Sequence, residues 1–261
     1  MTTSKKIAVV TPYYKDSSHY LSRCIESVKN QKYLDIEHFL ISDGCRNSIV
    51  DEYEVRHIII DRNHNDNGNT PRGFGSLLAI AEGFDAICLL DADNWLEPNH
   101  IFLCLDAATN SELSFNSVDY VYSRRNFKKP DGTSLDWTQE TNHIDTSELM
   151  LFRGSFPVLS RWSLMPNKLS PICDKVFYLM LKSAGLKGVC TEQKTVNFTM
   201  LYPQVYKSMK LPIPAEANHE IDWKKIKKFI DGLAGRDRQI VCKNMGIDER
   251  TDFSIKPFEM S

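Results

Sequence analysis

The sequence predicts a single α/β domain whose mostly parallel β-sheet is flanked by helices. Along the first half of the chain, short continuously apolar segments alternate with longer segments that carry apolar residues at helical spacing. Continuous apolar strands separated by amphipathic helices are typical of a parallel sheet covered on both faces. The length of 261 residues suits one such domain, or one domain with a small appendage.

The first half of the chain contains most of the expected regular elements. Four apolar segments are the expected strands, at residues 6–11, 37–42, 55–60 and 86–90. Two segments between them have the spacing of helices, at residues 20–30 and 70–83. Residues 61–69 are rich in Asn and Asp, lack periodicity and predict a loop.

The second half is less regular. It predicts strands at residues 119–123, 149–152 and 195–199 and a helix at residues 176–184. A proline-rich linker, residues 211–214, precedes an amphipathic basic helix at residues 222–233. We therefore expect a main domain over residues 1–214 and a helical tail over residues 215–261, in which we recognise no motif.

Charge and hydropathy exclude several classes of protein. The formal net charge is -2 and no long basic run occurs, so a sequence-independent nucleic-acid binder is not expected. No apolar stretch approaches the roughly 18 residues that a membrane span requires. The first residues do not form a signal peptide, and the seven scattered cysteines contain no C-x-x-C pair. We expect a cytoplasmic protein with buried, reduced cysteines, and the sequence predicts no oligomeric state.

The segment Asp91-Ala92-Asp93 follows the fourth expected strand directly. Two carboxylates separated by one residue can share one hard divalent cation, and Mg²⁺ or Mn²⁺ typically takes one or two protein carboxylates beside water and phosphate oxygens. Thr11 and Asp43 end two other expected strands, and ligands bind beyond the carboxyl ends of parallel strands. The alternative is that Asp93 or Asn94 caps a helix that begins near Pro98.

Four segments occur in an order and at distances that resemble those of the family 2 inverting glycosyltransferases with the GT-A fold. They are Ile-Ala-Val-Val-Thr-Pro-Tyr-Tyr (7–14), Glu-Ser-Val-x-x-Gln (26–31), Ile-Ser-Asp-Gly (41–44) and Leu-Leu-Asp-Ala-Asp (89–93). The resemblance covers roughly residues 5 to 200. It implies a GT-A-like, single Rossmann-like nucleotide-binding domain. It further implies Mn²⁺ or Mg²⁺, a nucleotide-sugar donor with UDP as the expected nucleotide, and a glycan or other hydroxyl acceptor.

The resemblance also implies roles for individual residues. Thr11 is expected to touch the base, Asp43 to accept the uracil N–H, and Arg72 to lie near the diphosphate. Asp91 and Asp93 are the expected metal ligands. The full set of expected nucleotide-binding residues is Thr11, Pro12, Tyr13, Asp43, Arg72, Asp91 and Ala92. Two alternatives remain open: Asp43 could belong to an ordinary Asp-Gly turn, and Arg72 could be a solvated residue of a first helical turn.

Asp174 is the expected catalytic base, because it resembles the acid that opens the corresponding helix in the family. The usual Glu-Asp pair is here Cys173-Asp174, and Asp favours the N-cap position, so capping is the alternative role. Asp145, in the segment His143 to Ser147, is the reserve candidate, and it could equally cap a turn. Trp137 and Trp162 could stack on a sugar but better fit a core. His64 is expected to be a solvated loop residue.

Two other functions remain open. A sugar nucleotidyltransferase would share this layout, but its glycine-rich loop is replaced by Pro-Tyr-Tyr-Lys-Asp at residues 12–16. A catalytically inactive sugar-nucleotide-binding module is the other alternative. The four acids Asp43, Asp91, Asp93 and Asp174 argue against it, because a decayed site has no reason to keep them all.

Overall fold

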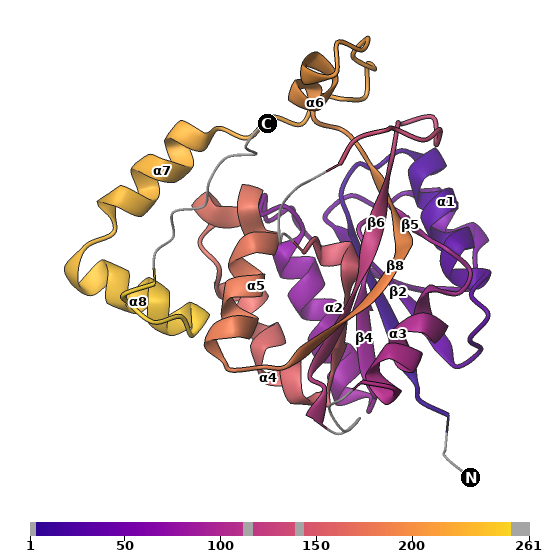
Figure 1. Ribbon diagram of the computed structural model, residues 1–261, viewed down its shortest axis with the longest axis horizontal. Coiled ribbons are helices and arrows are strands. Elements are labelled where there is room, and N and C mark those ends of the chain that lie inside the picture. The colour runs from indigo at the N-terminus through magenta and orange to yellow at the C-terminus, as the bar shows by residue number, and fades with distance from the viewer. Residues whose placement is uncertain (1–3, 112–116, 139–143, 252–261) are drawn as a thin grey trace.

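A computed structural model describes residues 4–111, 117–138 and 144–251 of the chain. In this part of the chain an eight-stranded sheet has the order β3-β2-β1-β4-β7-β6-β8-β5 (Figure 1). The strands are β1 (Ile7–Tyr13), β2 (Ile36–Asp43), β3 (Arg56–Ile60), β4 (Ala86–Leu89), β5 (Trp95–Leu96), β6 (Tyr120–Lys128), β7 (Leu149–Phe152) and β8 (Gly188–Thr199).

Helices cover both faces of this sheet. The α-helices are α1 (Ser18–Lys29), α2 (Asn69–Ala81), α3 (His100–Thr109), α4 (Phe156–Leu159), α5 (Cys173–Ser183), α6 (Pro203–Ser208), α7 (Trp223–Gly232) and α8 (Gly235–Met245). Short 3₁₀ helices include η1 (Ser48–Glu52), η3 (Thr146–Glu148), η4 (Arg153–Ser155), η5 (Ser160–Leu164) and η6 (Asn167–Ile172). Figure 1 shows α1 and α3 on one side of the sheet and α2, α4 and α5 on the other.

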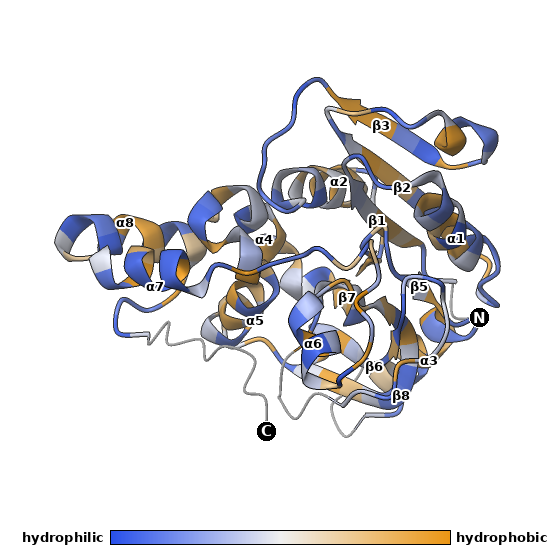
Figure 2. Cartoon of the chain, turned by 90° about the horizontal axis from the view of Figure 1, so that it is seen from above, coloured by the Kyte–Doolittle hydropathy of each residue, from blue (hydrophilic) through white to orange (hydrophobic). Residues whose placement is uncertain are grey.

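The first half of the sheet is parallel, as predicted. β1 pairs in parallel with both β2 and β4, and β2 pairs in parallel with β3. Alternate residues of β1 belong to different apolar clusters: Ile7 and Val9 pack with α1 and α3, whereas Ala8 and Val10 pack on the α2 side. Both faces of β1 are therefore covered, with α1 and α2 on either side of it in Figure 2, which is why its residues 7–10 are all apolar.

The second half of the sheet is mixed. β7 runs antiparallel to β4 and β6, while β8 is parallel to β6 and antiparallel to the two-residue strand β5. β5 follows Asp93 almost directly, and α3 begins only at His100 with Asn99 at its N-cap position. The alternative that Asp93 or Asn94 caps that helix is therefore wrong.

Two glycines allow α2 to lie close to its neighbours. A Cβ atom at Gly75 would come within 2.8 Å of the Val10 side chain in β1, and one at Gly73 within 2.8 Å of the Ser163 hydroxyl in η5. A larger side chain at either position would have to push the neighbouring element away. These glycines fix α2, and with it Arg72, between the sheet and η5.

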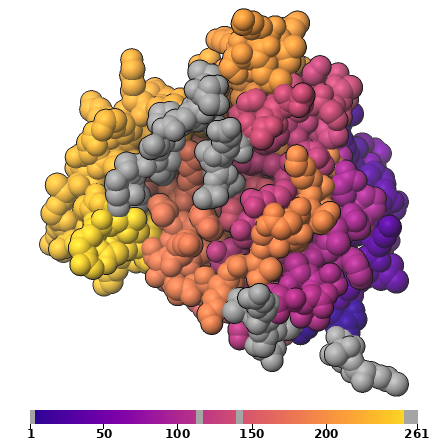
Figure 3. Space-filling view, in the orientation of Figure 1, coloured from indigo at the N-terminus to yellow at the C-terminus, as the bar shows by residue number. Residues whose placement is uncertain are grey.

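The C-terminal helices pack on the same core as α5. Ile226 of α7 and Cys242 and Met245 of α8 belong to the apolar cluster that contains Phe177. The Arg161 guanidinium of η5 donates a hydrogen bond to the Met245 carbonyl over 3.3 Å. Figure 3 shows the yellow surface of this region beside the salmon surface of α5. The division at residue 214 stays a prediction, and residues 252–261 of the expected tail lie outside the described residues.

Among the residues that the structure describes, no helix is both long and apolar enough to cross a membrane.

Candidate functional site

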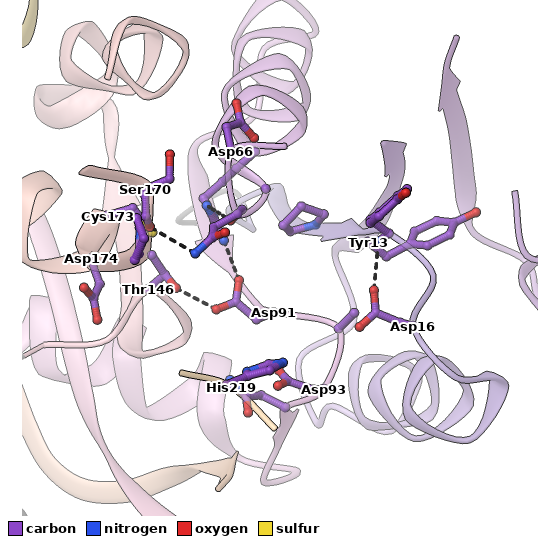
Figure 4. A pocket seen from close by; sticks show the side chains of 18 of the residues that line it. Tyr13, Asp16, Asp66, Asp91, Asp93, Thr146, Ser170, Cys173, Asp174 and His219 are labelled. Atoms are coloured by element: carbon purple, nitrogen blue, oxygen red, sulfur yellow. Dashed lines mark hydrogen bonds and ion pairs between the residues drawn. The ribbon is translucent and has the colours of Figure 1, made fainter. Parts of the chain in front are cut away.

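A cavity of about 610 Å³ opens beyond the carboxyl ends of β1, β2 and β4. We call one side of it the nucleotide end, formed by Pro12, Tyr13, Asp43 and residues 63–68. We call the other side the reaction end, formed by Asp145, Asp174, Phe198, Tyr202 and residues 218–221. Asp91 lies between the two ends in Figure 4, with Tyr13 on one side and Asp174 on the other.

At the nucleotide end, Asp43 is held by the loop that follows β3. Its carboxylate accepts hydrogen bonds from the His64 ring (Nδ1, 2.6 Å), the His64 backbone N–H (3.0 Å) and the Asn63 amide (3.1 Å). Gly44 has a φ of 79°, and a Cβ atom there would meet the Arg62 backbone at 2.4 Å. Asp43 is thus more than an ordinary turn residue, and the expectation that His64 is merely solvated is wrong.

The three residues Thr11, Pro12 and Tyr13 at the end of β1 have different surroundings. Pro12 and Tyr13 line the cavity, and the Tyr13 hydroxyl bonds the His57 ring over 2.7 Å. Thr11 is fully buried, bonds the His38 ring over 2.8 Å and is not among the lining residues. The structure therefore brings Pro12 and Tyr13 to the cavity but leaves the Thr11 side chain behind it.

Arg72, which is buried, and Asp91, which is half-buried, form an ion pair in the centre of the cavity. Arg72 Nη2 lies 2.6 Å from Asp91 Oδ1, and the other carboxylate oxygen of Asp91 accepts a hydrogen bond from Thr146 over 2.8 Å. The Arg72 guanidinium lies 4.8 Å from the centre of the Trp162 ring, and only 2% of the residue is exposed. The alternative of a solvated Arg72 is wrong.

Asp93 lies close to other acids. Burial raises its pKa well above the ordinary value, and the charges of Asp91, Asp16 and Asp145 add to the shift. Burial, with a contribution from Asp91, likewise raises the pKa of Asp16 to about 6. The Asp93 carbonyl accepts a hydrogen bond from Arg23 over 3.0 Å, which fixes its backbone. Ala92 lines the cavity between the two acids.

This concentration of negative charge fits a divalent cation. Within the described ranges, no group of three or more His, Cys, Asp or Glu residues is arranged to hold a metal. Asp91 and Asp93 supply two carboxylates, which is what Mg²⁺ or Mn²⁺ takes from a protein when water and phosphate oxygens complete its coordination. The side chains present therefore suit a cation that is bound together with a diphosphate.

The two candidate bases have different environments. Asp145 is the N-cap of η3: it accepts from the Ser147 N–H over 3.0 Å, its own N–H donates to Glu148, and it pairs with Arg125 at 3.2 Å. Asp174 is the second residue of α5, whose N-cap position is occupied by Ile172. Its carboxylate accepts from the adjacent Lys175 N–H over 2.7 Å and lines the cavity. Asp145 is a cap, whereas Asp174 is not the N-cap of α5, although its carboxylate accepts one backbone N–H of the first turn.

One wall of the cavity was not predicted from the sequence. Residues 218–221, between α6 and α7, contribute Asn218, His219, Glu220 and Ile221 to the reaction end, next to Tyr202. The His219 ring lies edge-on to Tyr202 at 6.0 Å, and burial lowers the pKa of His219. The only available signal was a polar His-Glu pair between a proline-rich linker and a helix.

The two tryptophans considered for sugar stacking belong to the core. Trp162 is fully buried and stacks on Phe177 with ring centres 4.1 Å apart. Trp137 packs edge-on against Phe127 at 4.6 Å. Neither lines the cavity, where the aromatic side chains are those of Tyr13, Tyr14, Phe198 and Tyr202. His143 of the predicted acceptor segment lies outside the described residues.

Comparison with known proteins gives consistent results. The family model described as glycosyl transferase family 2 matches residues 8–164. Chondroitin synthase of Pasteurella multocida (strain Pm70) is 23% identical over 192 residues, which are 69% of this chain and 19% of that protein. Chondroitin synthase of Escherichia coli is 30% identical over 193 residues, 70% of this chain and 28% of that protein. The chain thus spans less than a third of either relative.

Solved structures share the fold. S. aureus TarS 1–349 in complex with UDP superposes with a TM-score of 0.54 at 14% identity, covering 92% of this chain and 70% of that one. The complex of the same protein with UDP-GlcNAc gives a TM-score of 0.59 at 12% identity, covering 92% and 71%. The predicted α/β fold, with its mostly parallel GT-A-like sheet, is confirmed.

Proposed function

The chain belongs to glycosyl transferase family 2, and from this premise we propose that it transfers a sugar from a UDP-sugar to a hydroxyl group of a glycan or another acceptor. The transfer is metal-assisted and inverts the anomeric carbon. One observation carries the proposal: Asp91 and Asp93 lie in a single cavity between the nucleotide end and Asp174. Such a cavity can hold a nucleotide, a diphosphate and an acceptor in that order along its length.

The preference for UDP rests on Asp43. An ionised carboxylate can only accept hydrogen bonds, and each of its oxygens has two lone pairs. Among the described residues, a single donor, the His64 ring, bonds to Oδ1 of Asp43, so this oxygen keeps the capacity to accept the N3–H of uracil. The complex of S. aureus TarS with UDP supports the same choice of nucleotide.

Asp93 and Asp91 hold the cation in this proposal. Both oxygens of Asp91 already accept bonds, from Arg72 and from Thr146, which favours Asp93 as the direct ligand and Asp91 as a ligand through water. A cation held there, Mn²⁺ or Mg²⁺, would supply Lewis-acid stabilisation of the negative charge that develops on the departing diphosphate. The Arg72 guanidinium, fixed between Asp91 and Trp162, orients the first carboxylate.

Asp174 accepts the acceptor proton. The acceptor oxygen bonds to the anomeric carbon while the bond from that carbon to the diphosphate oxygen breaks, and UDP leaves with the bonding electrons. The hydroxyl proton passes to the Asp174 carboxylate, as in general-base catalysis. Asp145, the reserve candidate, instead fixes η3, and through Thr146 it supports Asp91.

Calorimetry and turnover with a panel of nucleotides test the proposal. We expect UDP to bind in the presence of Mn²⁺, more weakly in excess chelator, and more tightly than GDP or dTDP. We also expect release of UDP from at least one UDP-sugar. Unchanged turnover in excess chelator would reject the metal, and tighter binding of GDP would reject the role of Asp43. Nucleotide binding without transfer or hydrolysis would favour the inactive binding module.

A further inference from the structure

The cavity has an unequal balance of charge. Among the described residues that line it, the only lysine or arginine is Arg72, and its guanidinium is already paired with Asp91. Eight acidic residues line the same cavity: Asp16, Asp43, Asp66, Asp91, Asp93, Asp145, Asp174 and Glu220.

The acids of the nucleotide end have partners within the fold. Asp43 is bonded by His64 and Asn63, and Asp66 accepts bonds from the backbone and hydroxyl of Thr70 at the start of α2. At the reaction end the described lining offers carboxylates, an amide and an imidazole, but no guanidinium or ammonium group.

Two cations near the reaction end already interact with acids of that end, Arg125 with Asp145 and Lys175 with Asp174. Arg125 lies 3.2 Å from Asp145 and 3.8 Å from Glu148, beneath the cavity lining. The Lys175 ammonium lies 5.1 Å from the centre of the Trp223 ring. The stretches of sequence outside the described residues add a single lysine, Lys256, and no arginine. The chain therefore has few cations that could reach a second anion in this cavity.

We propose, on the basis of the proposed function, that the donor sugar is uncharged: a neutral hexose or N-acetylhexosamine, and not a hexuronic acid. Carboxylates of ligands are typically bound by Arg or Lys, often through two parallel hydrogen bonds. A uronate at the reaction end would instead meet the carboxylates of Asp174 and Glu220, beside the Asp145 carboxylate that Arg125 already balances. The hydroxyl groups of a neutral sugar, in contrast, are hydrogen-bond donors that match these acceptors.

The electrostatic effect is large enough to measure. A carboxylate held about 6 Å from one uncompensated like charge, at the effective dielectric constant of a protein surface, loses roughly ten- to a hundredfold in affinity. In the proposed site, Asp93 and the diphosphate would balance the charge of a divalent cation, so the cation would not remove this effect.

Matched pairs of donors test the proposal directly. UDP-glucose and UDP-glucuronic acid differ only at C6, as do UDP-galactose and UDP-galacturonic acid, and UDP-GlcNAc and its uronic acid. Calorimetry with Mn²⁺ should show at least one neutral donor binding about tenfold or more tightly than its uronic acid. The ratio should shrink as salt is added. Equal or tighter binding of the uronic acid in every pair would overturn the proposal.

UDP alone separates this proposal from the proposed function. Failure of UDP to bind would reject the proposed function, and the neutral-sugar inference with it. Binding of UDP together with equal binding within every pair would reject only the neutral-sugar inference.

A charge reversal in the cavity wall sharpens the test. Glu220→Arg replaces an acid of the reaction end with a cation. It should therefore reduce the ratio of the affinity for the neutral donor to the affinity for its uronic acid by roughly three- to tenfold. Glu216→Arg is the matched control, because Glu216 is exposed on the same segment but does not line the cavity. The proposal would be contradicted if the affinity ratio were unchanged in Glu220→Arg, or if it changed equally in Glu220→Arg and Glu216→Arg.

Discussion

The two ends of the cavity are built in different ways. At the nucleotide end, Asp43 stands at the carboxyl end of a parallel strand and accepts three hydrogen bonds from one loop. At the reaction end, Asp174 stands in the first turn of α5, and residues 218–221 belong to the connection between two helices. We infer that the nucleotide end is a preformed frame, whereas the reaction end depends on how the C-terminal half packs.

The strongest test of this difference is Asp174→Asn. Asparagine keeps the size and polarity of the side chain but removes the basic oxygen, so turnover should fall by about 10²–10⁴-fold. UDP binding, which depends on the other end, should change less than about twofold. UDP release and calorimetry on the same preparation measure the two quantities.

Asp145→Asn is the matched control for Asp174. It breaks a buried ion pair with Arg125 and should lower the free energy of unfolding by about 2 kcal/mol, measured by urea denaturation. If Asp174→Asn turns over within a few-fold of the parent while Asp145→Asn is folded and inactive, the roles of the two acids are reversed.

The second test concerns the boundary between the two ends. Asp93→Ala should reduce Mn²⁺-stimulated turnover by about 10²–10³-fold, because the stabilisation of the leaving diphosphate is lost. The protein should fold, since Asp93 is half-buried and its neighbours are acids. Metal titrations of turnover check this, and an unaltered Mn²⁺ dependence would place the metal ligand elsewhere.

The third test addresses the nucleotide end alone. Asp43→Ala should weaken UDP binding by roughly ten- to a hundredfold, corresponding to about 1–3 kcal/mol for a hydrogen bond lost at a buried contact. Turnover at saturating donor should fall much less, in contrast to Asp174→Asn. Asp61→Ala, an exposed loop residue outside the cavity lining, is the control. Equal losses in the two variants would show that the effect comes from the loop and not from the base contact.

The smallest expected effect is on stability and depends on pH. The pKa of Asp16 is raised to about 6 in the folded protein. At any pH above the ordinary pKa of an aspartate, ionisation of Asp16 therefore lowers the free energy of unfolding. Asp16→Asn should therefore raise the melting temperature of the metal-free protein at pH 7–8, and the gain should disappear below about pH 4. A gain that is independent of pH would show that charge is not its cause.

The sequence predicted the nucleotide end better than the reaction end, for physical reasons. β1 and β2 are buried over most of their length, so residues 7–10 and 39–41 form continuous apolar segments just before the cavity. Asp43, Arg72 and Asp91 were placed correctly beside it. β5 has only two residues and exists through its pairing with β8, so no local pattern could predict it. The contribution of Glu220 likewise depends on packing between distant segments.

Asp145 and Asp174 show the same limit at the level of single residues. Each precedes a helical segment in the sequence, and each could cap it. Which one does so depends on where the helix begins: one residue after Asp145, but one residue before Asp174. A shift of two residues in a helix boundary, which sequence patterns do not resolve, separates a structural acid from a candidate base.

Two adjacent residues of η5 connect the C-terminal helix with the centre of the cavity. Arg161 bonds the last residue of α8, and Trp162 lies beneath the guanidinium of Arg72. We therefore expect docking of α8 and occupation of the cavity to be linked equilibria, although α8 contributes no described lining residue. Bound UDP with Mn²⁺ should slow hydrogen exchange of the α8 backbone amides relative to those of α3 on the opposite face of the sheet. Helix α8 would then act as an allosteric reporter of donor binding.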